Sequence, residues 1–180
     1  MTDETLAIER VLQGDTESFR LLVERYERPV ARMIRNLTGD AHHCEDLAQD
    51  VFLTAFAKLR TFDPACSRFS TWLLTITRNK SINHLKKKRP RAIAEMPVRL
   101  DETTPLETLT HREAFAALER ALAALPRRQH RAFVLAEFEG LPYEQIAQIE
   151  GVRVGTIKSR VSRARARLSE TLRRNEANTP

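Results

Sequence analysis

Cysteine, glycine and long apolar runs are all scarce in this sequence of 180 residues. The two cysteines, Cys44 and Cys66, form neither a CxxC pair nor a disulfide framework. No apolar run approaches the roughly 18 residues that indicate a membrane-spanning helix. The acidic start, MTDETLAIER, lacks the apolar core of a signal peptide, so the chain is expected in the cytoplasm without membrane insertion. Five glycines and little β-branched alternation favour a helical protein.

Acidic side chains are missing from one long stretch in the middle of the chain. Residues 64–91 carry eight basic side chains and no acidic one, and residues 153–180 carry eight basic and two acidic ones. The segments before and between these two blocks are net acidic, although the whole chain has a net charge of +6. A single basic block is often only a solvated face. Two separate blocks favour a contact with nucleic acid at two places.

Apolar residues recur at helical spacing in four segments before residue 90. The pattern predicts helices over residues 5–13, 15–36, 44–59 and about 69–88, with Asp15 or Thr16 as the N-cap of the second. Three prolines interrupt the following stretch, and helical spacing resumes at Glu113. We therefore expect an all-α protein with two small helical domains, residues 1–91 and 111–180, joined by a flexible linker over 92–110.

The segment LPYEQIAQIEGVRVGTIKSRVSRARARL predicts a helix-turn-helix at residues 141–168. It follows two further helices, predicted over residues 113–125 and 128–139. Gly151 is expected in the turn. The second helix should bury one apolar stripe, formed by Ile157, Val161, Ala164 and Leu168. Such a helix can enter the major groove of DNA.

The side chains away from that stripe have the chemistry of DNA contacts. Arginine and lysine can pair with guanine edges and serine can donate or accept, so base contacts are predicted for Lys158, Ser159, Ser162 and Arg163. Phosphate contacts are predicted for Thr156, Arg160, Arg165 and Arg167.

Aromatic residues accompany the mid-chain basic block. Phe69 and Trp72 precede a run of polar and basic residues, and aromatic stacking combined with cationic tracking of the backbone is typical of single-strand binding. Trp72 is also in register with Leu73 and Ile76, which favours a place in the core. The predicted contacts of this helix with DNA are Phe69, Trp72, Arg78, Asn79, Lys80, Asn83, Lys86 and Lys87.

Acidic and amide side chains form a polar face on the helix predicted at residues 44–59. Glu45, Asp46, Gln49 and Asp50 cluster near its start. Carboxylates in a first helical turn often only complement the helix dipole. The alternative is a docking surface for a basic partner.

Together these motifs resemble the extracytoplasmic-function group of bacterial sigma factors. The C-terminal helix-turn-helix resembles sigma region 4, while DLAQDVFLTAFAKLRTF and FSTWLLTITRNKSINHLKKK resemble region 2. The resemblance spans nearly the whole chain. It implies that the C-terminal helix reads the −35 promoter element and that the mid-chain helix, with the loop at about residues 64–70, captures the melted −10 strand.

The resemblance also implies the partners. Core RNA polymerase would be bound through its β′ coiled coil and β flap, and an anti-sigma factor would hold the protein inactive. The implied contacts with polymerase are Asp46, Leu47, Gln49, Asp50 and Phe52. The polymerase would supply the catalysis, so no enzymatic activity and no cofactor are expected.

The residues also bear on two other functions and on a metal site. A dimeric helix-turn-helix repressor or activator would explain the C-terminus but not the aromatic–basic helix. A metal-dependent nuclease using Glu45, Asp46 and Asp50 would lack separated ligands. The adjacent residues His42, His43 and Cys44 cannot readily converge on one ion, so no metal is expected.

Overall fold

Every regular element in the described part of the chain, residues 3–87 and 110–177 of a computed structural model, is helical. The chain divides into two compact units, Met1–Lys87 (unit 1) and Lys88–Pro180 (unit 2). The expected all-α fold is confirmed. The predicted linker residues 92–109, together with Lys88 and Arg89, lie outside the described residues.

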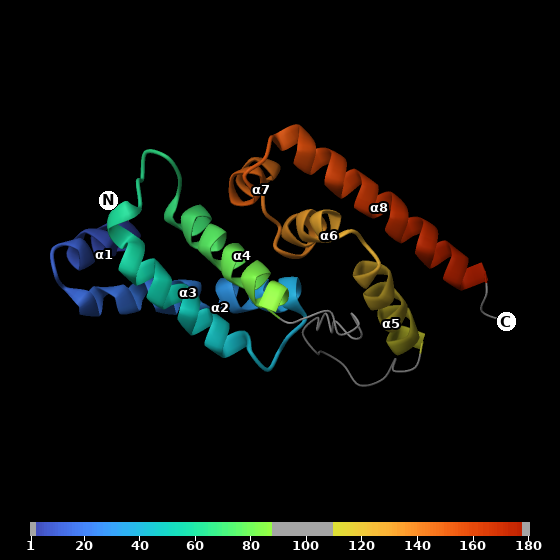
Figure 1. The fold of residues 1–180 in the computed structure, drawn as a ribbon, viewed down its shortest axis with the longest axis horizontal. Coiled ribbons are helices and arrows are strands. Elements are labelled where there is room, and N and C mark those ends of the chain that lie inside the picture. Colours follow the sequence, from blue (N-terminus) through green and yellow to red (C-terminus); the bar gives the residue numbers. More distant parts are fainter. Residues whose placement is uncertain (1–2, 88–109, 178–180) are drawn as a thin grey trace. The chain divides into compact units, whose positions relative to one another are not determined.

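Unit 1 holds four α-helices (Figure 1), and all four contribute side chains to one core. They are α1 (Asp3–Leu12), α2 (Phe19–Thr38), α3 (Cys44–Lys58) and α4 (Phe69–Lys87). Short 3₁₀ turns, Thr16–Ser18 and Leu59–Thr61, precede α2 and follow α3. Helices α2, α3 and α4 pack against one another in pairs. The completely buried side chains at their meeting point include Val30, Val51 and Leu73.

The start of α2 differs from its prediction because Asp15 folds back on the next residues. Its carboxylate accepts the Ser18 backbone N–H at 3.3 Å and the Ser18 hydroxyl at 2.6 Å. These bonds confirm Asp15 as a cap, but they close a 3₁₀ turn, and the α-helix begins only at Phe19. At the other end of α2, Gly39 takes a left-handed conformation (φ 65°), which glycine adopts without a steric penalty.

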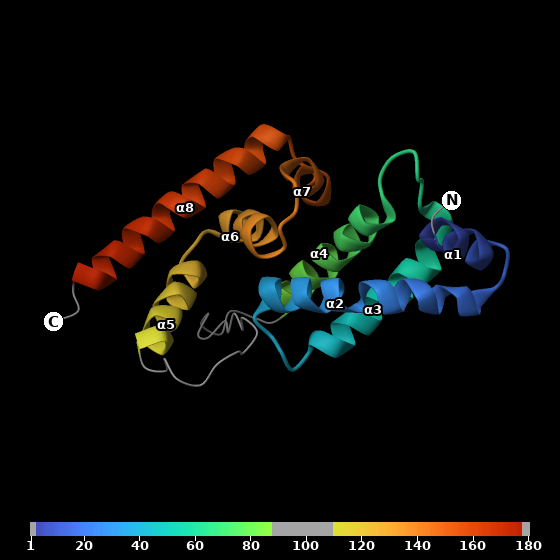
Figure 2. The same ribbon diagram turned by 180° about the vertical axis from the view of Figure 1, so that it is seen from behind.

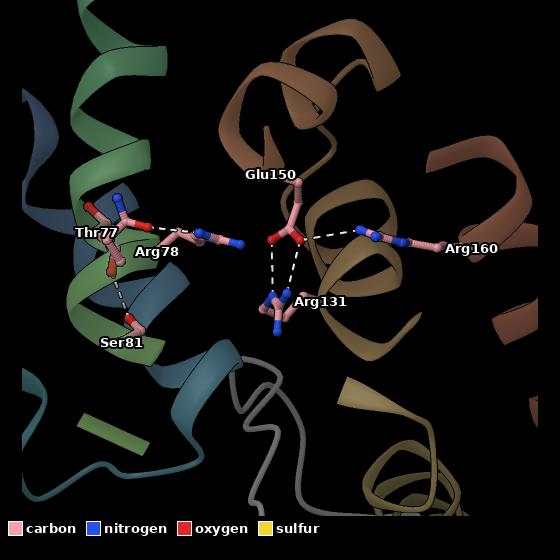
Figure 3. Close-up of polar contacts among 7 residues, drawn as sticks. Thr77, Arg78, Ser81, Arg131, Glu150 and Arg160 are labelled. Carbon is pink, nitrogen blue, oxygen red and sulfur yellow. Dashed lines mark hydrogen bonds and ion pairs between the residues drawn. The ribbon is translucent and has the colours of Figure 1, made fainter. Parts of the chain in front are cut away.

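Close packing of α4 against its neighbours relies on small hydroxyl residues. Thr77 and Ser81 are completely buried. Each hydroxyl donates to the carbonyl four residues earlier, to Leu73 and Thr77 respectively, at 2.9 Å. Figure 3 shows the second of these bonds, from Ser81 to Thr77. These bonds satisfy the buried hydroxyls without outside partners, so the helix can bury a polar stripe at little cost.

Unit 2 is built around its last helix, which packs against three others (Figure 2). Its helices are α5 (Thr110–Ala123), α6 (Arg127–Phe133), α7 (Tyr143–Glu150) and α8 (Val154–Ala177). The helix predicted over residues 128–139 is found as α6 followed by a π-helical turn, Val134–Phe138. The core includes Leu122, Leu125, Leu135, Ile146 and Ile149.

Candidate nucleic-acid interface

A short turn joins α7 to α8, as predicted for the helix-turn-helix. Gly151 ends α7 in the left-handed region (φ 66°), where a side chain would add strain. The Val152 N–H donates to the Ala147 carbonyl at 3.0 Å and the Gly151 N–H to the Gln148 carbonyl at 3.2 Å. These bonds satisfy the last carbonyls of α7. The chain can therefore reverse within a few residues and begin α8 at Val154.

The predicted apolar stripe of α8 is buried. Ile157 and Ala164 are completely inaccessible, and Val161 and Leu168 are 1% and 5% exposed. Lys158, Ser162 and Arg163 are exposed, and Ser159 is half-buried. Because the buried stripe prevents rotation of the helix about its axis, these four side chains are held on the outer side of unit 2.

A buried ion-pair cluster joins α6, α7 and α8 and includes one of the predicted DNA contacts. Glu150 has a side chain only 1% exposed, and it accepts two bonds of 3.0 Å from Arg131 and one of 3.4 Å from Arg160 (Figure 3). Arg160 is itself only 15% exposed. Arg160 was predicted as a phosphate contact, but in the structure Glu150 holds its guanidinium and little of its side chain is accessible. The role of Glu150 was not predicted, because no local sequence pattern marks its two arginine partners.

The remaining predicted phosphate contacts of α8 are accessible to different degrees. Arg167 is exposed and Thr156 is half-buried. Arg165 pairs with Glu137 at 2.6 Å but keeps 58% of its side chain exposed. An ion pair this open to water is weak, so a phosphate can compete for the arginine.

A polar stripe also runs along the outer face of α4. Asn79, Asn83, Lys86 and Lys87 are exposed and follow one another at helical spacing. The half-buried Arg78 donates from Nη1 to the Asn79 amide oxygen at 2.8 Å. The predicted polar contacts of this helix are therefore brought together on one surface.

The aromatic residues near the start of α4 pack against one another. Phe69 is 2% exposed and lies in the core of unit 1. Trp72 is half-buried, with ring centroids 5.5 Å from Phe62 and 5.7 Å from Phe69. The prediction that Phe69 stacks on a base is corrected, because apolar burial has placed both faces of its ring inside the protein. Of the two aromatic residues predicted to contact DNA, Trp72 keeps accessible surface, near the start of α4.

The polar face of α3 is exposed, but two of its predicted contacts are not. Asp46, Gln49 and Asp50 are accessible. Leu47 and Phe52 are each 8% exposed and belong to the core, which corrects their predicted role as direct contacts. Sequence analysis missed Leu53, which is 68% exposed, one turn beyond Gln49 and Asp50. Its signal was present in the sequence, because a leucine out of phase with the buried stripe is expected to face solvent.

One ion pair connects the polar faces of α3 and α4. The Lys80 ammonium lies 3.6 Å from the Asp50 carboxylate, and both side chains remain partly exposed, 32% and 61%. The two surfaces are therefore neighbours within unit 1, and Lys80 and Asp50 occupy the border between them.

Neither cysteine has the environment of a reactive thiol. Burial raises the pKa of the Cys44 thiol, and its sulfur donates to the Ala31 carbonyl at 3.3 Å. Cys66 is exposed, and its hydrogen bond to the Asp63 carboxylate raises its pKa. Both shifts disfavour the nucleophilic thiolate.

Two protein families match the chain, one in each unit. Sigma-70 region 2 matches residues 22–91, and Sigma-70, region 4 matches residues 115–168. These ranges contain α3 and α4 in the first case and the helix-turn-helix in the second. In the described residues, no helix is both long and apolar enough to span a membrane.

Several bacterial proteins are similar over almost their full length. The sigma-H factor of RNA polymerase from Pseudomonas aeruginosa is 33% identical, with 92% of this chain and 91% of that protein covered. The ECF sigma-E factor of Escherichia coli K12 is 32% identical over 92% and 91%. The ECF sigma factor SigW of Bacillus subtilis is 28% identical over 92% and 95%.

Solved structures share the fold. The sigma factor RpoE of Bartonella quintana, in complex with the anti-sigma factor NepR, superposes with a TM-score of 0.69 at 29% identity, covering 87% of this chain and 98% of that one. CnrH, in complex with the cytosolic domain of CnrY, has a TM-score of 0.71 at 24% identity over 99% and 100%.

These matches identify first a sigma factor and then the group of sigma factors to which the chain belongs. Regions 2 and 4 in this order are the parts with which sigma factors bind core RNA polymerase and recognise promoter DNA. The chain belongs to the extracytoplasmic-function (ECF) sigma factors of the sigma-70 family. It is accordingly a transcription initiation factor that directs RNA polymerase to specific promoters.

Proposed function

We propose that this sigma factor divides promoter recognition between its two units. Residues 1–91 contact core polymerase and the melted −10 strand, residues 111–180 read the −35 duplex, and residues 92–110 link them. The observation that carries the proposal is the fixed orientation of α8, which buries Ile157 and Val161 while exposing Lys158, Ser162 and Arg163. Linking two modest contacts on one polymerase raises the effective concentration of each.

The −35 contact is assigned to the exposed face of α8. Lys158 and Arg163 supply donors for guanine O6 and N7, and Ser159 and Ser162 supply hydroxyls that both donate and accept. Arg165 and Arg167, on the same helix, supply charge for phosphates. Arg160 acts differently, because its ion pair with Glu150 ties the start of the recognition helix to the end of α7.

The −10 contact is assigned to the polar stripe of α4. Asn79 and Asn83 carry amides that can bond to the edges of unpaired bases, while Lys80, Lys86 and Lys87 neutralise the backbone. Arg78 supports Asn79 through the bond between their side chains. We assign the contact with a flipped base to Trp72 and to the exposed loop residues Pro64, Ala65 and Arg68.

The contact with polymerase is assigned to the exposed face of α3. Asp46, Gln49 and Asp50 offer two carboxylates and an amide to basic groups of the β′ coiled coil, and Leu53 adds an apolar centre that excludes water. Leu47 and Phe52 support this face from inside the core. The contact of unit 2 with the β flap rests on the family resemblance.

The family resemblance also suggests how this sigma factor is regulated and where in the cell it acts. The similar sigma factor RpoE was solved with the anti-sigma factor NepR. By analogy, an anti-sigma factor holds this protein inactive in the cytoplasm, where its polymerase is found. The sigma factor performs no chemistry of its own, and the polymerase carries out catalysis.

Run-off transcription with core polymerase tests the proposal. Start-site mapping should yield initiation at a defined set of promoters, and Arg163→Ala should relax base preference at one −35 position, a loss of roughly 1–3 kcal/mol in discrimination. The matched control is Arg173→Ala, an exposed arginine of the same helix beyond the recognition face. Failure to initiate from any double-stranded template, or equal effects of the two variants, would overturn the assignment.

A further inference from the structure

Three side chains with metal-binding chemistry converge where the turn after α2 meets α4. The Asp40 carboxylate oxygen Oδ2 lies 3.0 Å from His43 Nδ1 and 3.1 Å from His84 Nε2. The three candidate ligand atoms all lie within 4.8 Å of one another, and the two imidazole centroids are 5.5 Å apart. Asp40 and His84 are 44 residues apart in sequence, so only folding brings them together.

The spacing of these atoms suits a single small cation. In a tetrahedral site with bonds of about 2.0–2.1 Å, neighbouring ligand atoms are about 3.3 Å apart. The two measured distances are close to that value, so small rotations of the two rings would complete the geometry. An ion between them would replace direct carboxylate–imidazole hydrogen bonds with coordination bonds.

Burial also distinguishes this cluster from a chance surface group. The Asp40 and His84 side chains are only 10% and 16% exposed, whereas that of His43 is 52% exposed. Two of the three side chains are thus largely buried, and the third, His43, borders solvent. Such a site leaves one side for water, as in metal sites with three protein ligands.

We propose that Asp40, His43 and His84 bind one divalent first-row transition-metal ion of the Zn²⁺ type. Two imidazole nitrogens and one carboxylate oxygen suit such ions, whereas soft Cu⁺ prefers thiolate and thioether ligands. Neither thiol completes the set, because Cys44 is directed to the Ala31 carbonyl and Cys66 to Asp63. The bound ion ties the turn before α3 to the C-terminal half of α4 and stabilises unit 1.

Zinc titration of the full chain without a histidine tag, after removal of metals with a chelator, tests the site. Calorimetry with ZnCl₂ should give one ion per chain. His84→Ala and Asp40→Asn should each weaken binding at least tenfold. The matched control is His42→Ala, which removes an exposed neighbouring histidine outside the cluster and should leave the affinity unchanged. The absence of stoichiometric binding, or equal losses for His42→Ala and His84→Ala, would overturn the proposal.

Three further measurements test the site even if His84→Ala fails to fold. His43→Ala alters a half-exposed side chain, so it should fold normally and still weaken zinc binding at least tenfold; unchanged affinity would contradict the proposed ligand set. Co²⁺ as a probe should give visible absorption without a thiolate charge-transfer band, and such a band would instead assign a cysteine ligand. When thermal unfolding is followed by Trp72 fluorescence, zinc should raise the Tm of the parent protein but not that of His43→Ala.

Discussion

Removal of the Glu150 carboxylate should destabilise unit 2 strongly. The carboxylate is 1% exposed and holds two guanidinium groups, those of Arg131 and Arg160. Breaking a buried ion pair from one side costs about 3–5 kcal/mol, because the remaining charge is left uncompensated. The two arginine side chains keep 16% and 15% exposure, so water can reach them in part. We therefore expect Glu150→Ala to cost about 3 kcal/mol, near the lower end of that range.

Urea denaturation combined with hydrogen exchange can measure this loss separately for unit 2. Amides of α6, α7 and α8 should exchange faster in Glu150→Ala, by an amount matching the lost free energy of unfolding. Trp72 is the only tryptophan of the chain and lies in unit 1, so its fluorescence reports the other unit as an internal control. Its urea midpoint should not change.

A matched variant separates the buried cluster from ordinary surface charge. Glu170 pairs with Arg174 on α8, and both side chains are more than two-thirds exposed, at 71% and 73%. Glu170→Ala should cost no more than about 0.5 kcal/mol. If Glu150→Ala lowers stability by no more than Glu170→Ala, the inference that the cluster holds α6, α7 and α8 together is refuted.

Three further predictions concern pH, the core and the polymerase-binding face. Burial lowers the pKa of His130 to about 4 in the folded protein, whereas an exposed imidazole in the unfolded chain has a pKa of about 6.5. Unfolding therefore takes up a proton below about pH 6.5. The contribution of His130 to stability should be constant above that pH, and stability should fall by about 3 kcal/mol as the pH approaches 4. The same pH dependence in urea midpoints of His130→Asn would contradict this. Phe69→Ala should lower the stability of unit 1 by about 3–5 kcal/mol in Trp72 fluorescence; a stable variant defective only in DNA binding would restore its role in stacking. Leu53→Glu should reduce capture of core polymerase with an unchanged Tm, while Leu21→Glu, a matched exposed leucine on α2, should not; equal capture by both variants would exclude Leu53 from the contact.

The sequence alone determined the helices and the inner face of most of them. Apolar spacing is a local property, and burial of a continuous stripe is the main stabilisation available to a helix in a small unit. Ile157, Val161, Ala164 and Leu168 could therefore be assigned to the core of unit 2 without coordinates. The turn at Gly151 was equally predictable, because few residues other than glycine accept its backbone conformation.

Tertiary structure decided which polar groups meet and which apolar groups remain outside. Phe69, Leu47 and Phe52 were expected at interfaces, but the core of unit 1 had room for their side chains. Arg160 was expected to meet phosphate, but Glu150 lies within reach. Asp40, His43 and His84 come together only when the turn after α2 docks on α4. Periodicity specifies the inner face of a helix, but the partner of each side chain depends on how separate helices pack.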